Sequence, residues 1–171
     1  MTMSMYQASV PVFVQMLGGL SQVLDKAEAY ATEKKVDPSV MFNLRLHPTM
    51  WAFAKEVQAA TDFARDGAAR LAGAEPLAIE ANEKSFADLK TRVKKSIEFV
   101  QSFKPAQIDG SEDKVIKRKM GDREATFKGQ DYLQGFVMPN FYFFCTTAYD
   151  ILRSHGVDLV KRDYIGKIPG Q

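Results

Sequence analysis

The chain is poor in the residues that most often carry catalytic or metal-binding chemistry. Its 171 residues include one cysteine, one tryptophan and two histidines. A single cysteine excludes an internal disulfide framework, and we infer a reducing, cytoplasmic setting. Two histidines cannot by themselves complete a zinc site. The sequence therefore predicts a scaffold more clearly than it predicts a reaction.

Neither sign of charge is in excess, and no stretch is a candidate membrane span. Lys and Arg number 23 and Asp and Glu 21, and the two signs are interleaved along the chain. Proteins that bind nucleic acid usually present a basic face, so we expect no nucleic-acid partner. The opening MTMSMYQASVPVF has no basic residue before its apolar stretch, unlike a signal peptide. The most apolar later stretch, 138–156, is too short and too polar at its end to cross a bilayer, so we expect no membrane partner.

Aromatic side chains are concentrated in that later stretch, which reads MPNFYFFCTTAYDILRSHG. At helical spacing two adjacent faces of it are apolar, and such a helix is normally buried on several sides. We predict that it is the central helix of a bundle and that it lines any pocket. One face carries Val137, Phe141, Phe144, Ala148 and Ile151, and the other carries Tyr142, Cys145, Tyr149 and Leu152.

Earlier in the chain, apolar residues recurring at steps of three and four predict two long helices. The first covers about residues 6–35, and Pro11 is expected to kink or restart it because proline lacks the amide donor. Its Gly18-Gly19 pair would let a neighbouring helix approach closely. Asp37-Pro38 is expected to open one short turn. The second long helix is expected to start near His47-Pro48 by the same logic and to stop at Gly73.

A third long helix is expected from a capping box at Ser85–Asp88 to about Phe103, with Arg92 among the charged residues of its solvated face. After it, VIKRKM and REATF flank Gly121-Asp122, which is the pattern of a β-hairpin. The tail 157–171 is expected to be an irregular strap. With no internal repeat or linker, we predict one all-α domain over residues 1–171, a four-helix bundle with a short β-hairpin before the fourth helix.

Three stretches of the chain carry a resemblance to a known family. They are MYQASVPVFVQMLGGLSQVLDKAEAYA, LRLHPTMWAFAKEVQAATDFARDGAARLAG, and NFYFFCTTAYDILRSHGV followed by KRDYIG. The chain resembles an uncharacterised bacterial and fungal branch of the DinB/YfiT-like superfamily, known only as a domain of unknown function. The resemblance implies an up-down-down-up four-helix bundle, often dimeric. Many superfamily members hold a divalent metal through three histidines, and others are thiol-dependent transferases or isomerases.

The chain departs from the superfamily at the metal site that the resemblance implies. That site takes one histidine from the second helix and two, spaced four apart, from the fourth. The second helix here reads TDFARDG in this region, without a histidine. The related pattern NFYFHVTTAY has His-Val where this chain has Phe144 and Cys145, and the position four further on is Ala148. A phenylalanine offers no lone pair, so the triad cannot form as inherited.

Several residues allow both a functional and a structural interpretation. His47 precedes Pro48 at a helix start, and His155 lies in a last helical turn, where a donor suits exposed carbonyls. Cys145 is either a nucleophile or a small buried apolar residue, and its aromatic neighbours favour the second. Asp62 and Asp66, with Asp150 on another helix, could bind a metal inside the bundle or pair with basic side chains.

Two hypotheses of function follow. The first is a bundle that has lost the metal triad and binds a small apolar ligand. The second is a transferase or hydrolase, dependent on a metal or a thiol cofactor, with a rebuilt site between the second and fourth helices. The candidate pocket residues are His47, Trp51, Asp62, Phe63, Tyr142, Phe144, Cys145 and Tyr149.

A homodimer is also expected, in part from the resemblance. The first helix carries apolar residues beyond its main stripe, namely Val12, Val14, Met16 and Val23. An exposed apolar patch often marks an interface. The tail 157–171 could instead cover these residues within one chain.

Overall fold

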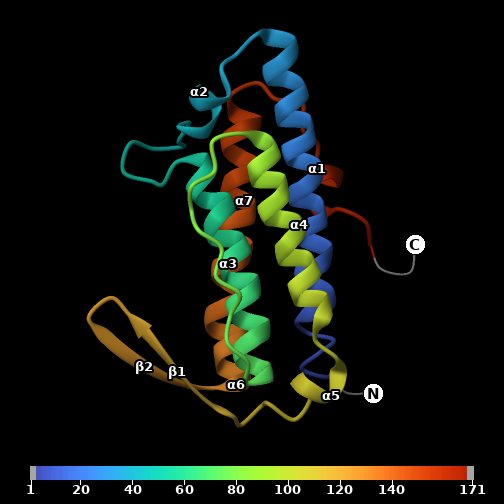
Figure 1. Ribbon diagram of the computed structural model, residues 1–171, viewed down its shortest axis with the longest axis vertical. Helices are drawn as coiled ribbons and strands as arrows, with labels where there is room; N and C mark the ends of the chain where they lie inside the picture. The colour runs from blue at the N-terminus through green and yellow to red at the C-terminus, as the bar shows by residue number, and fades with distance from the viewer. Residues whose placement is uncertain (1–2, 169–171) are drawn as a thin grey trace.

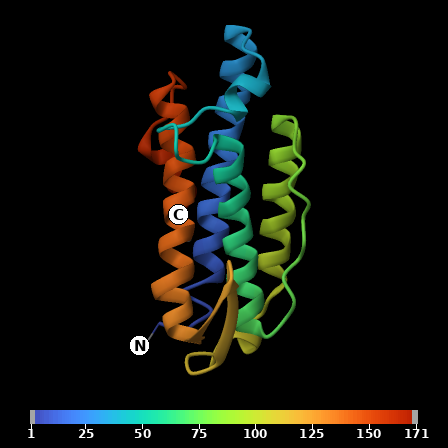
Figure 2. The same ribbon diagram turned by 90° about the vertical axis from the view of Figure 1, so that its left-hand side faces the viewer.

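Four long helices lie side by side in the computed structural model, which describes residues 3–168 (Figure 1). They are α1 (Val10–Lys34), α3 (Phe53–Ala72), α4 (Phe86–Ser102) and α7 (Met138–Ser154). Helix α1 runs up the bundle, α3 and α4 both run down, and α7 returns upward (Figures 1 and 2). The predicted bundle and its up-down-down-up order are confirmed.

The two parallel neighbours α3 and α4 require a long connection, residues 73–85, which carries the chain back along the whole bundle (Figure 2). Around the bundle axis, α3 packs against α4 on one side and α7 on the other, and α1 packs against both α4 and α7. The core contains one fully buried phenylalanine from each long helix. These are Phe13, Phe53, Phe86 and Phe141. The Phe13 and Phe141 rings meet edge to face at 5.1 Å between centroids.

Local signals place most helix ends as expected. Pro11 lies in the first turn of α1, where a missing amide donor costs no helical hydrogen bond. The short helix α2 (Pro38–Phe42) begins after Asp37, whose carboxylate accepts a hydrogen bond from the Ser39 amide at 2.7 Å. Helix α4 has the predicted capping box between Ser85 and Asp88. Helix α3 ends at Gly73, which has a left-handed φ of 75°.

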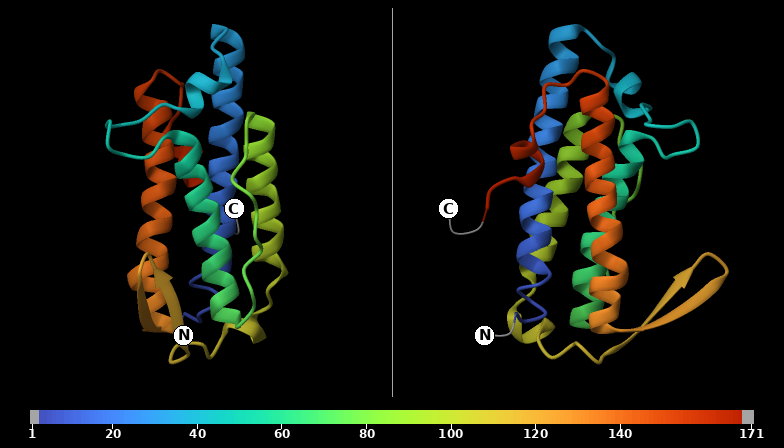
Figure 3. Two further views of the ribbon diagram at one scale, coloured as in Figure 1. Left: turned by 60° about the vertical axis from the view of Figure 1, so that its left-hand side comes forward. Right: turned by 180° about the vertical axis from the view of Figure 1, so that it is seen from behind.

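The predicted start of α3 at His47-Pro48 is wrong. The Met50 amide donates to the carbonyl of His47 at 2.9 Å, which closes a turn around Pro48, and α3 begins only at Phe53. Proline suits the second position of such a turn as well as the first position of a helix, so the sequence signal was ambiguous. Residues 43–52 instead form a loop that projects sideways from the upper part of the bundle (Figure 3).

A hairpin and three short helical segments join α4 to α7. Helix α5 (Pro105–Ile108) precedes strands β1 (Val115–Met120) and β2 (Arg123–Lys128), which pair antiparallel with Met120 opposite Arg123. The hairpin projects from the lower end of the bundle (Figure 3). Helix α6 (Gly129–Asp131) and the π-helical turn η1 (Tyr132–Val137) then lead into α7. Pro139 follows η1 and has no amide hydrogen to donate to a carbonyl of the preceding turn. The missing hydrogen bond accounts for the widened turn.

The tail is more ordered than the sequence indicated. Residues 161–165 form helix α8 (Lys161–Ile165), which packs along α1. A Cβ on Gly19 would lie 2.3 Å from the Tyr164 carbonyl oxygen, so only glycine permits this approach. Gly18 has no such neighbour. The final part of the predicted strap, residues 169–171, lies outside the described residues.

Candidate functional site

An open pocket of about 240 Å³ lies where the loop before α3 meets the first turn of α3 and the middle of α7. Helices α3 and α7 pack against each other and run in opposite directions, so the loop before α3 lies beside α7. The pocket is mainly apolar at its surface. It is lined by Thr49, Met50, Trp51, Glu56, Phe143 and Phe144.

Aromatic rings form the walls of this pocket. The Trp51 and Phe144 rings stack with 5.5 Å between centroids and only 10° between planes. The Phe144 ring also contacts Phe63, with 5.4 Å between centroids, so Phe144 packs against two aromatic side chains. Phe144 is buried, whereas Trp51 is 48% exposed and Phe143 is 55% exposed. Two large aromatic side chains are therefore accessible at the mouth of the pocket.

The acidic side chain among the residues that line this pocket is Glu56, in the first turn of α3. Glu56 is only 1% exposed, and its Oε2 atom has no hydrogen-bond partner among the described residues. Burial raises the pKa of this carboxyl to about 7. A buried carboxyl without a partner is costly, and perturbed groups of this kind are concentrated at functional sites. Glu56 is not among the site residues that the sequence predicted.

The candidate residues from the sequence fall into separate places. Trp51 and Phe144 line the pocket, and Phe63 contacts Phe144 without lining the pocket itself. His47 is exposed, and its Nδ1 atom lies 3.0 Å from the hydroxyl oxygen of the pocket residue Thr49. Asp62, another of these candidates, belongs to a polar cluster between α3 and α4.

Three other candidates lie on the side of α7 that meets the tail. The Tyr149 hydroxyl donates to the Leu159 carbonyl at 3.5 Å, and its ring contacts Tyr164. Tyr142 is partly exposed, and burial raises the pKa of its hydroxyl. Cys145 is buried, and this burial raises the pKa of the thiol well above its usual range. A thiol in this environment is a poor nucleophile.

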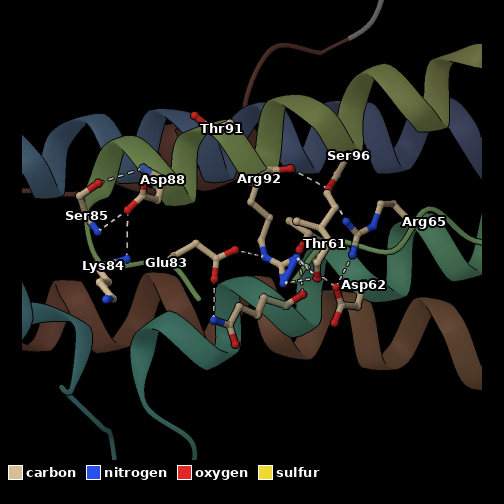
Figure 4. Close-up of polar contacts among 12 residues, drawn as sticks. Thr61, Asp62, Arg65, Glu83, Lys84, Ser85, Asp88, Thr91, Arg92 and Ser96 are labelled. Atoms are coloured by element: carbon tan, nitrogen blue, oxygen red, sulfur yellow. Dashed lines mark hydrogen bonds and ion pairs between the residues drawn. The ribbon is translucent and has the colours of Figure 1, made fainter. Parts of the chain in front are cut away.

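The polar cluster is organised by Arg92, which the sequence placed on a solvated face. That prediction is wrong, because Arg92 is 2% exposed. The crossing segment 73–85 covers this side of α4, and its Glu83 places Oε1 2.7 Å from Arg92 Nε. Arg92 also donates to the Ile79 carbonyl at 3.3 Å and lies 3.5 Å from a carboxylate oxygen of Asp62 (Figure 4).

Further side chains from α3 complete this cluster. Gln58 donates to the second carboxylate oxygen of Glu83 at 2.8 Å. Arg65 is buried and donates to Asp62 (Figure 4). Burial raises the pKa of Asp62 although two arginines oppose that shift. The Asp62 carboxylate is therefore engaged in ion pairs rather than free to hold a ligand.

Asp66 is engaged in the same way, one turn further along α3. It forms ion pairs with Arg118 of the hairpin and with Arg70, whose Nε lies 3.6 Å away. The Arg118 guanidinium also lies 5.0 Å from the centre of the Phe63 ring. These contacts attach the hairpin to the bundle. Asp62 and Asp66 both pair with basic side chains, which is the structural one of the two interpretations that the sequence allowed.

The residues of α7 at the positions of the metal triad do not fit the metal site that the resemblance implies. Phe144 presents a ring that contacts Trp51 and Phe63, and Ala148 is buried one turn further along α7. The Nδ1 atom of His155 lies 2.7 Å from the Ile151 carbonyl, to which it donates. Within residues 3–168, no group of three or more His, Cys, Asp or Glu side chains is placed to hold a metal ion.

Residues 5–165 match the model of DUF1993, a domain of unknown function. The chain belongs to this family. A crystal structure of a DinB family member protein from Shewanella denitrificans is similar to this DUF1993 chain, with a TM-score of 0.86 and 33% sequence identity. The likeness covers 97% of this chain and 94% of that one, so the resemblance in sequence is confirmed. No curated protein matches the chain.

Any helix of the DUF1993 chain that crossed a bilayer would need about 20 consecutive, mainly apolar residues. Over the described residues, none combines the length and the apolar character needed to cross a membrane.

Proposed function

We propose that this DUF1993 protein binds a small apolar ligand with an aromatic ring in the pocket formed by Trp51, Glu56, Phe143 and Phe144. The observation that carries the proposal is the stacked Trp51–Phe144 pair, which leaves Trp51 half exposed beside the exposed ring of Phe143. Small-molecule sites are concave and mainly apolar, with a few polar groups that fix orientation. A flat ring entering the pocket would contact aromatic faces already arranged in offset and edge-to-face pairs.

We also propose that the superfamily's metal triad has been lost and that an aromatic wall has taken its place. Support comes from Phe144, which stands where the related pattern has a histidine, and from Ala148 one turn later. The competing hypothesis is a metal- or thiol-dependent transferase or hydrolase with a rebuilt site between α3 and α7. It would need free carboxylates or a reactive thiol, yet Asp62 and Asp66 are paired with arginines and Cys145 is buried.

The tryptophan itself supplies the test, because Trp51 is the only one in the chain. Its emission should change saturably when 2-phenylethanol is titrated into the intact protein. Phe143→Ala should weaken this binding severalfold, because it removes an exposed wall. Leu77→Ala, at another exposed apolar side chain outside the pocket, should leave it unchanged.

A linear, unsaturable response to 2-phenylethanol and related aromatics would refute the proposed pocket. Metal analysis addresses the second hypothesis, using protein purified without a histidine tag. Stoichiometric zinc, nickel or iron bound between α3 and α7 would contradict the loss of the metal site and support the enzyme hypothesis.

We propose, third, that the protein forms a homodimer in the cytoplasm. DinB/YfiT-like bundles often pair, and Val12 and Val14 on α1 stay partly exposed. Against this, Met16 and Val23 are buried, and α8 packs along the same helix. Light scattering at micromolar concentration decides: a mass near the 19.2 kDa of one chain would end the dimer proposal.

A further inference from the structure

The pocket contains a carboxyl that stands apart from the other sheltered acids of the chain. Glu83 pairs with Arg92, Asp66 with Arg118, and Asp163 with Lys26 at 2.7 Å. Each of these carboxylates has a cation from another segment. Glu56 is at least as deeply buried, and its Oε2 atom has no hydrogen-bond partner in the described part of the chain.

The surroundings of Glu56 suit a cation. A buried carboxylate is stabilised by a charged donor, and charge-assisted hydrogen bonds are stronger than neutral ones. The aromatic faces beside it attract positive charge as well. The chain already shows this preference, because the ammonium of Lys55 lies 5.7 Å from the centre of the Trp51 ring. An anionic ligand would meet both a buried carboxyl and the negative faces of the rings.

Resting on the pocket proposed above, we propose that its ligand class is a small aromatic amine whose ammonium pairs with Glu56 while its ring packs against Trp51 and Phe143. The amine would supply the partner that Glu56 Oε2 lacks. The aromatic walls would bind the ring, and they would also exclude water from the ion pair. Specificity would then come from Glu56, since a site built around a buried polar group discriminates against ligands that leave it unpaired.

Three probes of nearly the same shape test this assignment. They are 2-phenylethylamine, 2-phenylethanol and 3-phenylpropanoate, which are cationic, neutral and anionic. Titrations followed by Trp51 emission and by calorimetry are done at pH 8, where the Glu56 carboxyl is ionised. We expect the amine to bind at least tenfold more tightly than the alcohol and the anion to bind most weakly.

Variants separate the role of Glu56 from that of the pocket. Glu56→Gln keeps the shape of the side chain and should reduce the preference for the amine to less than twofold, while binding of the alcohol persists. Glu75→Gln, at an exposed glutamate outside the pocket, should keep the full preference. Circular dichroism would establish that both variants fold.

The outcomes distinguish the two levels of the proposal. If the amine and the alcohol bind alike, or if Glu56→Gln keeps the amine preference, the amine assignment is refuted and the aromatic pocket stands. If none of the three probes binds saturably, the pocket itself is refuted together with this inference.

Discussion

The Nε atom of Arg92 lies 2.7 Å from Oε1 of Glu83, and both side chains are almost completely buried. The pair joins α4 to the crossing segment that precedes it. Arg92 also forms an ion pair with Asp62 on α3. Two parallel neighbours in a bundle need such a long crossing segment, and nothing in its own sequence predicts where it packs. The buried ion pair fixes this segment against α3 and α4.

Arg92→Met should lower the free energy of unfolding by about 3–5 kcal/mol, because it leaves Glu83 buried without its partner. The double variant Arg92→Met, Glu83→Gln should recover much of that loss. Lys94→Met, which removes an exposed pair with Glu98 on the same helix, should cost less than about 1 kcal/mol. Urea unfolding measures all three. A loss below about 1 kcal/mol for Arg92→Met would show that the pair does not hold the crossing segment.

Arg92 also shows where the sequence stops being informative. Apolar periodicity identified the four long helices, the Ser85–Asp88 capping box fixed one start, and Gly121-Asp122 located the hairpin turn, because all three signals are local. Arg92 is not part of the apolar stripe of α4, and its side chain is interior because the crossing segment covers it together with α3. A covering element distant in sequence cannot be inferred from helical periodicity.

The adjacent glycines of α1 provide a matched pair of substitutions. Gly19→Ala would place a methyl group 2.3 Å from the Tyr164 carbonyl oxygen, so α8 must move away from α1. Gly18→Ala meets no atom within 4 Å and should stabilise the helix by up to about 1 kcal/mol, because alanine is the better helix former. Thermal unfolding should therefore shift in opposite directions for the two variants. Equal stabilisation would mean that α8 is not docked at Gly19.

Phe144→Ala should lower the free energy of unfolding by about 3–5 kcal/mol, because it empties the space between Trp51 and Phe63. It should also shift Trp51 emission to longer wavelength, since the indole loses its stacked neighbour. Phe143→Ala, the exposed neighbour in sequence, should cost less than about 1 kcal/mol. Denaturant unfolding compares the two, and similar small losses would place Phe144 outside the core.

Cys145 should react slowly with thiol reagents in the folded protein, because burial disfavours the thiolate that is the reactive form. As the only cysteine, it gives an unambiguous signal in a colorimetric thiol assay. The same protein in guanidinium should react at the rate of a free thiol. Rapid and complete labelling at neutral pH without unfolding would revive the nucleophile hypothesis.

The candidate site was partly visible in the sequence. The aromatic stretch 138–156 indicated which helix lines a pocket, and Trp51 and Phe144 lie together there, with Phe63 in contact with Phe144. Glu56 was missed although a signal existed. It follows Phe53 by three positions and precedes Ala60 by four, which puts a carboxyl on the buried stripe of α3. What the sequence could not give is the missing partner, because that depends on every segment packed around the side chain.

The same carboxyl predicts how stability depends on pH. Burial raises the pKa of Glu56 from 4.5 to about 7 in the folded protein, whereas the unfolded chain keeps the ordinary value. Between these two values the folded state binds more protons than the unfolded state, so this residue makes the free energy of unfolding fall as pH rises. Below pH 4.5 the carboxyl is protonated in both states and contributes no slope, and above about pH 7 its penalty is complete. When Glu56 is ionised in both states, this pKa shift lowers the free energy of unfolding by about 3 kcal/mol.

Glu56→Gln removes the titrating group, so its stability advantage over the parent should be absent at pH 4 and should grow to a plateau by pH 8. Glu75→Gln, at an exposed site, should show no such difference. Urea unfolding of the three proteins across this pH range isolates the contribution, because every other ionisable group cancels in the comparison. An advantage independent of pH would mean that Glu56 titrates normally and is hydrated. In that case the unpaired carboxyl would no longer distinguish this pocket from the rest of the surface, and the aromatic walls alone would define its ligand.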